Sequence, residues 1–176
     1  MKSTIKLVKP SMIYKDQIWN YKLDFHRRNE SLAGCGPLER VDCVEAWLKD
    51  VVNYENEDTC PKGHVPSTIY LAVRKEDNKL VGIIDFRHHI EHPILSVWGG
   101  HIGYSVLYDE RRKGYATEML RQVLIKCLEF GLSQVLVTCD EGNVGSKKVI
   151  LANGGKFEKK VYIDQTVKER YWIPLS

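Results

Sequence analysis

The segment covering residues 106–117 constrains the fold most, because it joins a strand to a helix through a short basic turn. Behind the turn a helical apolar period begins, with Ala116, Leu120, Val123 and Cys127 on one face and Gly131 placed as a C-terminal cap. A buried strand follows at residues 135–138. Strand, helix and strand in this order predict a βαβ unit with two parallel strands and a right-handed crossover.

The turn itself has the properties of an anion-binding site. The first backbone N–H groups of a helix have no intrahelical partner, and the helix dipole adds about half a positive charge, so a pyrophosphate fits without a metal. Gly114 allows the backbone to approach such a group closely. The chain has neither GxxxxGK[ST] nor GxGxxG after a strand, so the two common nucleotide loops are absent. An ordinary basic helix start on a protein surface is the alternative interpretation.

The remaining pattern predicts one α/β domain over residues 1–176. A chain of this length with 43% hydrophobic residues can close a single core. We expect a mixed, twisted sheet of about seven strands, antiparallel except for one central parallel pair, with about four helices. The expected strands lie at residues 4–9, 68–73, 80–86, 97–107 and 135–138, with two more from Lys156 and Lys168; the other helices carry Ile18 and Phe25, Trp47 and Val51, and residues 144–152.

Composition selects no partner. The formal charge of +3 is ordinary, and the basic residues are scattered among 23 acidic ones, which argues against a nucleic-acid-binding protein. The five cysteines are an odd number without a CxxC pair, which predicts reduced thiols and a cytoplasmic location. No apolar run reaches the ~18 residues of a membrane span. Cys60, His64, His88, His89 and His92 match no familiar zinc spacing, so no metal is expected.

The turn Arg111-x-x-Gly114-x-Ala116 resembles the Arg/Gln-x-x-Gly-x-Gly/Ala turn of the GNAT superfamily of N-acetyltransferases, in a poorly characterised branch of predicted acetyltransferases. The resemblance covers approximately residues 67–157. It includes Gly103-Tyr104 before the turn, Asn143-x-x-Ser146 after the last buried strand, and residues 153–157 downstream.

This resemblance implies an acetyl-CoA-dependent enzyme that moves an acetyl group to an amine by direct attack in a ternary complex. The turn would hold the pyrophosphate, and the pantetheine arm would lie where the fourth and fifth strands splay apart. Asn143 and Ser146 have helix capping as an alternative role. The cofactor-binding residues implied are Tyr104, Val106, Arg111, Arg112, Lys113, Gly114, Tyr115, Ala116, Asn143 and Ser146.

Two positions depart from the pattern that many relatives carry. Ile150 replaces a frequent tyrosine that protonates the leaving thiolate, so Ser146, water or no acid at all would serve here. His101 stands where many relatives carry a glutamate and is the predicted general base, with a strand histidine of no catalytic role as the alternative. Cys139 is interpreted as a small buried hydrophobe and not as a nucleophile.

Several alternatives stay open at this point. A non-catalytic acyl-CoA sensor or regulatory module would keep the turn and lack a competent acceptor cleft. The acceptor is expected to be a small-molecule or peptide amine, with its side of the cleft formed by the first 66 residues, and no nucleic acid or membrane partner is expected. The oligomeric state is open, with a homodimer among the alternatives.

Overall fold

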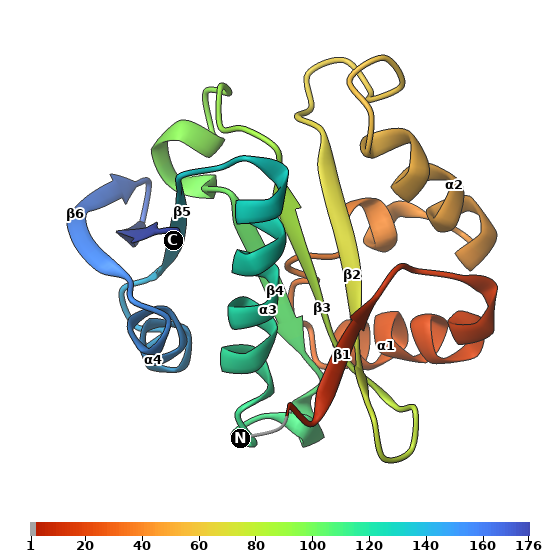
Figure 1. The fold of residues 1–176 in the computed structure, drawn as a ribbon. Coiled ribbons are helices and arrows are strands. Elements are labelled where there is room, and N and C mark those ends of the chain that lie inside the picture. Colours follow the sequence, from red (N-terminus) through yellow and green to blue (C-terminus); the bar gives the residue numbers. More distant parts are fainter. Residues whose placement is uncertain (1–2) are drawn as a thin grey trace.

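The computed structural model describes residues 3–176, and its elements alternate in the order expected of an α/β chain (Figure 1). The strands are β1 (Ile5–Val8), β2 (Ser67–Arg74), β3 (Leu80–Arg87), β4 (Ile102–Val106), β5 (Gln134–Asp140), β6 (Lys156–Ile163) and β7 (Thr166–Pro174). The α-helices are α1 (Lys15–Arg27), α2 (Val44–Tyr54), α3 (Tyr115–Phe130) and α4 (Val144–Ala152). Four short turns complete the described part: η1 (Met12–Tyr14), η2 (Gly36–Arg40), η3 (Leu95–Gly99) and η4 (Tyr108–Glu110).

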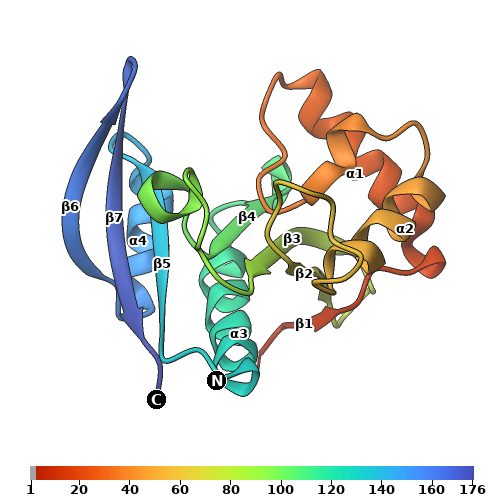
Figure 2. The ribbon, with the colours of Figure 1, turned by 90° about the horizontal axis from the view of Figure 1, so that it is seen from above.

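The strands form two antiparallel sheets, ordered β1-β2-β3-β4 and β5-β7-β6. Figure 2 shows these sheets diverging, with α3 between them and with α1 and α2 beyond the larger sheet. The expected parallel pair is not found as a ladder in residues 3–176, because β4 and β5 belong to different sheets. The backbones meet just before β4, where the N–H of His101 donates to the carbonyl of Leu136 at 2.8 Å. Beyond that point the two strands belong to different sheets and no longer pair.

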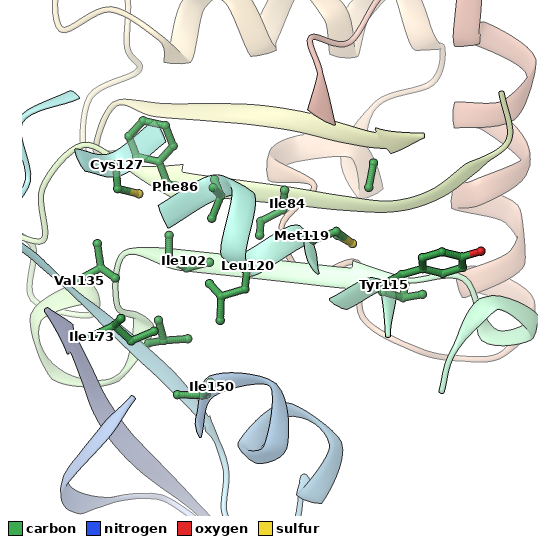
Figure 3. Packing of buried hydrophobic residues seen from close by; sticks show 14 of the residues in the cluster. Ile84, Phe86, Ile102, Tyr115, Met119, Leu120, Cys127, Val135, Ile150 and Ile173 are labelled. Carbon is green, nitrogen blue, oxygen red and sulfur yellow. The ribbon is translucent and has the colours of Figure 1, made fainter. Parts of the chain in front are cut away.

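Two apolar cores lie on the two faces of the larger sheet. Successive residues of β3 point to opposite faces, as in any strand, so that Ile83 packs toward α1 and α2 while Ile84 packs toward α3. The apolar stripe of α1 is buried at Ile18, Tyr21 and Phe25, as its period predicts. Figure 3 shows the second core, in which side chains from β3, β4, α3, β5, α4 and β7 meet.

The segment before β4 differs from its expected form. Residues 97–107 read as one strand, but Leu95–Gly99 forms a π-helical turn and β4 begins only at Ile102. Gly100 has a φ of 68°, and a Cβ there would lie 2.6 Å from the carbonyl oxygen of Leu136. Glycine therefore ends the turn and permits the close approach of the two sheets.

Candidate active site

The predicted anion-binding turn has the backbone conformation that the sequence suggested. Gly114 is the N-cap of α3 with a φ of 83°, and Arg112 also takes a positive φ of 63°. Within the described chain, no protein acceptor is found for the backbone N–H groups from Arg112 to Thr117. These donors, together with the positive end of the helix dipole, make the turn suitable for a phosphate group.

The turn forms one end of a cavity of ≈ 790 Å³. The other walls come from β4, from the start of α4 and from the loop that follows α1. Nine of the residues predicted to bind the cofactor line this cavity: Tyr104, Val106, Arg111, Arg112, Gly114, Tyr115, Ala116, Asn143 and Ser146. Lys113 and His101 are not among the lining residues.

The two walls approach each other through a pair of hydroxyl groups. The Tyr104 hydroxyl on β4 lies 2.5 Å from the Ser146 hydroxyl on α4. Burial raises the pKa of Tyr104 to about 12, so its phenol keeps its proton near neutral pH. The pair therefore links β4 to α4 at the wall of the cavity.

Asn143 combines the two roles that the sequence left as alternatives. Its side-chain oxygen accepts a hydrogen bond from the N–H of Ser146 at 3.0 Å, which caps α4. The same residue lines the cavity beside Ser146. Capping is thus observed, and contact with a ligand remains a prediction.

Glu110 anchors the turn from inside the fold. Its carboxylate lies 2.9 Å from Arg74, 2.6 Å from Lys79 and 2.9 Å from Lys113, and its side chain is only 4% exposed. Burial alone would raise the pKa of Glu110, but the three cations outweigh it and hold this pKa at about 2. Lys113, which the sequence assigned to the cofactor, is therefore engaged in holding the turn.

The loop after α1 reaches the same cavity, a feature that the sequence did not specify residue by residue. Glu30 pairs with Arg111 at 2.5 Å, and Arg111 also donates to the Val106 carbonyl at 3.0 Å. Phe25 packs under the Arg111 guanidinium, with 5.7 Å to its ring centroid. In the sequence, Gly34 and Gly36 indicate a loop after this helix but indicate no contact partner for it.

His101 lies apart from the cavity and is almost fully buried. Its Nδ1 accepts a hydrogen bond from the N–H of Leu136 at 2.8 Å, so the ring proton of the neutral form is on Nε2. Burial, followed by Arg87 and His89, lowers the pKa of His101 to about 4. The predicted role as general base has no support in this geometry, because neither ring nitrogen offers a free lone pair to an amine.

Other residues named from the sequence occupy structural positions. Ile150, at the position of the frequent tyrosine, is fully buried in the core shown in Figure 3. Burial raises the pKa of Cys139 to about 11, which leaves its thiol protonated near neutral pH. Within residues 3–176, no group of three or more His, Cys, Asp or Glu side chains is arranged to hold a metal ion. No helix there is both long and apolar enough to cross a bilayer.

The sequence matches one family model. The model of the acetyltransferase (GNAT) domain matches residues 23–156, which is most of the chain. No curated protein matches the sequence.

Solved structures of acetyltransferases share the fold at low sequence identity. RimL, the ribosomal L7/L12 alpha-N-protein acetyltransferase in complex with coenzyme A, is 16% identical with a TM-score of 0.69, covering 99% of this chain and 96% of that one. The microcin C7 self-immunity acetyltransferase MccE, in complex with acetyl-CoA and AMP, is 17% identical with a TM-score of 0.65, covering 99% and 94%. A GNAT-family acetyltransferase from Bacillus anthracis is 20% identical with a TM-score of 0.64, covering 98% and 95%.

Proposed function

Because the chain belongs to the GNAT family of acetyltransferases, and is thus an acyltransferase that uses acetyl-CoA, we propose that it acetylates an acceptor amine directly, in a ternary complex. The observation that carries the proposal is the ≈ 790 Å³ cavity, which joins a phosphate-suited turn to β4 and to the start of α4. We further propose a cytoplasmic location for this single domain, which its five free cysteines support.

In the proposed complex the N–H groups of Arg112 to Ala116 would hold the pyrophosphate. The start of α3 supports this, because its N-cap Gly114 has no side chain that could accept from them. The backbone of Tyr104 and Val106 would hold the pantetheine arm, since both residues line the cavity. Binding both substrates side by side converts the reaction into a step within one complex, which removes much of its entropic cost.

The transfer forms one bond and breaks one. The lone pair of the neutral amine attacks the acetyl carbon, the new C–N bond forms, the C–S bond breaks, and its electron pair stays on sulfur. The nitrogen gives up a proton, and the thiolate of CoA takes one up or leaves as it is, since a thiol has a pKa of about 8.5. The Ser146 hydroxyl, paired with Tyr104, is our candidate donor of that proton, because it lines the cavity and Ile150 does not.

A pair of glycine variants tests the cofactor site. Gly114 and Gly131 cap opposite ends of α3, both have positive φ, and neither has a neighbour within 4 Å of an added Cβ. Valine should therefore strain both positions similarly, while only Gly114→Val obstructs the cavity. Losing two charge-assisted hydrogen bonds of about 1.5 kcal/mol each predicts a loss of about 100-fold in CoA affinity. Calorimetric titration of both folded variants with CoA measures this difference.

An amine panel tests the activity. Acetyl-CoA, the protein and a broad set of amines should release free CoA thiol, and the release should require Gly114 in the same assay. Equal CoA affinity of Gly114→Val and Gly131→Val would refute the cofactor site. Tight CoA binding without acetylation of any amine, in small molecules or peptides, would instead support the non-catalytic sensor.

A further inference from the structure

The cofactor cavity contains more positive charge than its own carboxylates balance. Among the described residues that line it, Glu30 and Glu110 carry carboxylates, and each of them is already paired with cations of the protein. Arg112 and Lys148 also line the cavity, and both are exposed. Neither forms an ion pair within residues 3–176. Two positive charges are therefore left for negative groups of a ligand.

The basic residues next to these two in the chain are engaged within the protein. Both neighbours of Arg112 are held by carboxylates, at 2.5 Å on one side and 2.9 Å on the other. Lys147, which precedes Lys148, pairs with Glu169 of β7 at 3.2 Å. The fold thus satisfies the adjacent charges and leaves the side chains of Arg112 and Lys148 available at the cavity.

Lys148 lies close to the start of α3, although it belongs to α4. The side-chain amide nitrogen of Asn153 donates to the carbonyl of Thr117 at 3.2 Å and to the carbonyl of Val149 at 2.9 Å. One nitrogen therefore bridges the first turn of α3 and the middle of α4. Thr117 and Val149 both line the cavity, and Lys148 directly precedes Val149. The lysine is thus on the wall beside the helix start that is suited to a phosphate.

Coenzyme A carries negative charge in two places. In the proposed complex its pyrophosphate is held by backbone N–H groups of the turn, and a third phosphate is attached to the 3′ position of the ribose next to the pyrophosphate. A phosphate monoester has a charge of about −1.5 to −2 at pH 7. Arginine and lysine are the side chains that bind phosphate groups most readily. Two free cations beside the turn match this third phosphate in sign and in amount of charge.

We propose that the side chains of Arg112 and Lys148 bind the 3′-phosphate of the cofactor, one from the turn and one from α4, and that the protein thereby selects CoA over dephospho-CoA, which lacks this phosphate. This inference rests on the proposed function and adds Lys148 to the residues that hold the cofactor. The backbone of the turn binds the pyrophosphate, which both compounds have. The two side chains recognise the group in which the compounds differ.

Calorimetric titration with CoA and with dephospho-CoA at low salt tests the selectivity. The parent should bind CoA about tenfold more tightly, which corresponds to about 1.4 kcal/mol. Lys148→Gln should weaken CoA binding about threefold and leave the affinity for dephospho-CoA at the parental value. In the double variant of Arg112→Gln and Lys148→Gln, the preference for CoA should fall to within about twofold. Added salt should reduce the parental preference, because both cations are exposed.

Lys49→Gln is the matched control. Lys49 is an exposed lysine within a helix, α2, and like Lys148 it forms no ion pair with the described residues. It does not line the cofactor cavity. The control should therefore bind both compounds as the parent does, although it loses the same charge.

The outcomes separate this inference from the function on which it rests. Equal affinity of the parent for CoA and dephospho-CoA would overturn the inference and leave the cofactor site intact. The same holds if Lys148→Gln weakens the binding of both compounds equally, or if Lys148→Gln and Lys49→Gln reduce the preference alike. Failure of the parent to bind either compound would reject the cofactor site and this inference together.

Discussion

Among single residues, Glu110 holds the turn before α3 through three ion pairs. It is buried, and it connects cations from β2, from the β2–β3 connection and from the turn itself. We expect Glu110→Gln to lower the free energy of unfolding by about 2 kcal/mol near pH 7, because hydrogen bonds to charged groups contribute about 1.5–3 kcal/mol each. Urea unfolding of the parent and the variant measures the difference.

The same residue predicts an acid dependence of stability. In the unfolded chain a glutamate has a pKa of about 4.3, whereas in the fold Glu110 titrates at about 2. Its stabilisation is therefore complete above about pH 4.3 and is lost as the pH falls toward 2. The gap between parent and Glu110→Gln should close over that interval, and a gap that stays constant down to pH 2 would contradict the assignment.

His101 gives the second prediction for a single residue. Since its pKa is about 4, its imidazole is neutral near pH 7, and His101→Ala should leave the dependence of the acetylation rate on pH unchanged. The variant should be less stable by about 1–3 kcal/mol, because the N–H of Leu136 loses its acceptor. The opposite result would be a parent whose rate rises with pH through a pKa near 6 to 7, and a His101→Ala variant of parental stability that lacks this rise. That result would restore the general-base role that the sequence predicted.

At this scale the sequence predicted residues that line one cavity, and it predicted little about the partners that set their protonation. Glycine and arginine in the turn have roles that the backbone determines locally, so Arg111 and Gly114 could be named in advance. The surroundings of His101 could not be predicted, because its partner Leu136 comes from a segment far along the chain. Burial and partners, which decide a pKa, are properties of the fold and not of the residue type.

Among the elements, α4 has the clearest double role. Its predicted bounds, residues 144–152, agree with the observed Val144–Ala152. Asn143→Ala should cost about 1 kcal/mol of stability through the lost cap and should also raise the KM for acetyl-CoA. Asn143→Ser keeps a capping side chain but lacks the carboxamide, so it separates the two effects.

The comparison of these two variants is decisive for Asn143. A high KM in both would show that the carboxamide contacts the cofactor. A parental KM in Asn143→Ser, together with restored stability, would limit Asn143 to capping.

Helices with a clear period and a cap were predicted well, because both signals are local. The sequence did not predict the π-helical turn η3, because the groups that stabilise it are distant in the chain. Side chains from β3, β5 and β7 donate hydrogen bonds to its backbone carbonyls. Val97 and Trp98 have the composition of a strand, and the sequence alone does not reveal that distant donors bind their carbonyls.

On the scale of the whole molecule, Arg170 helps to join the two sheets. From β7 it donates to the carbonyls of Ser96 and Val97, both at 2.6 Å, and pairs with Glu158 on β6. It thereby ties η3, which leads into β4 of the larger sheet, to the smaller sheet. Arg170→Met should lower the stability by about 3 kcal/mol, as expected when a buried charged partner is removed.

Lys159→Met, at an exposed position of β6, is the control for Arg170→Met and should unfold with the parent. Urea unfolding followed by both fluorescence and far-UV circular dichroism would also show whether the chain unfolds as one domain. Equal midpoints for Arg170→Met and Lys159→Met would contradict the role of Arg170.

The divergence of β4 from β5 gives this protein an edge strand in its interior. Edge strands attract other chains, and the outer edge β6 carries Lys156, Lys159 and Lys160, charges of the kind that discourage such pairing. β4 needs no such charges, because its unpaired side faces the cofactor cavity, which admits a slender ligand more readily than another polypeptide. In the proposed complex, the amide groups of the pantetheine arm would pair with this side of β4, so the incomplete sheet would serve the ligand and not another polypeptide chain.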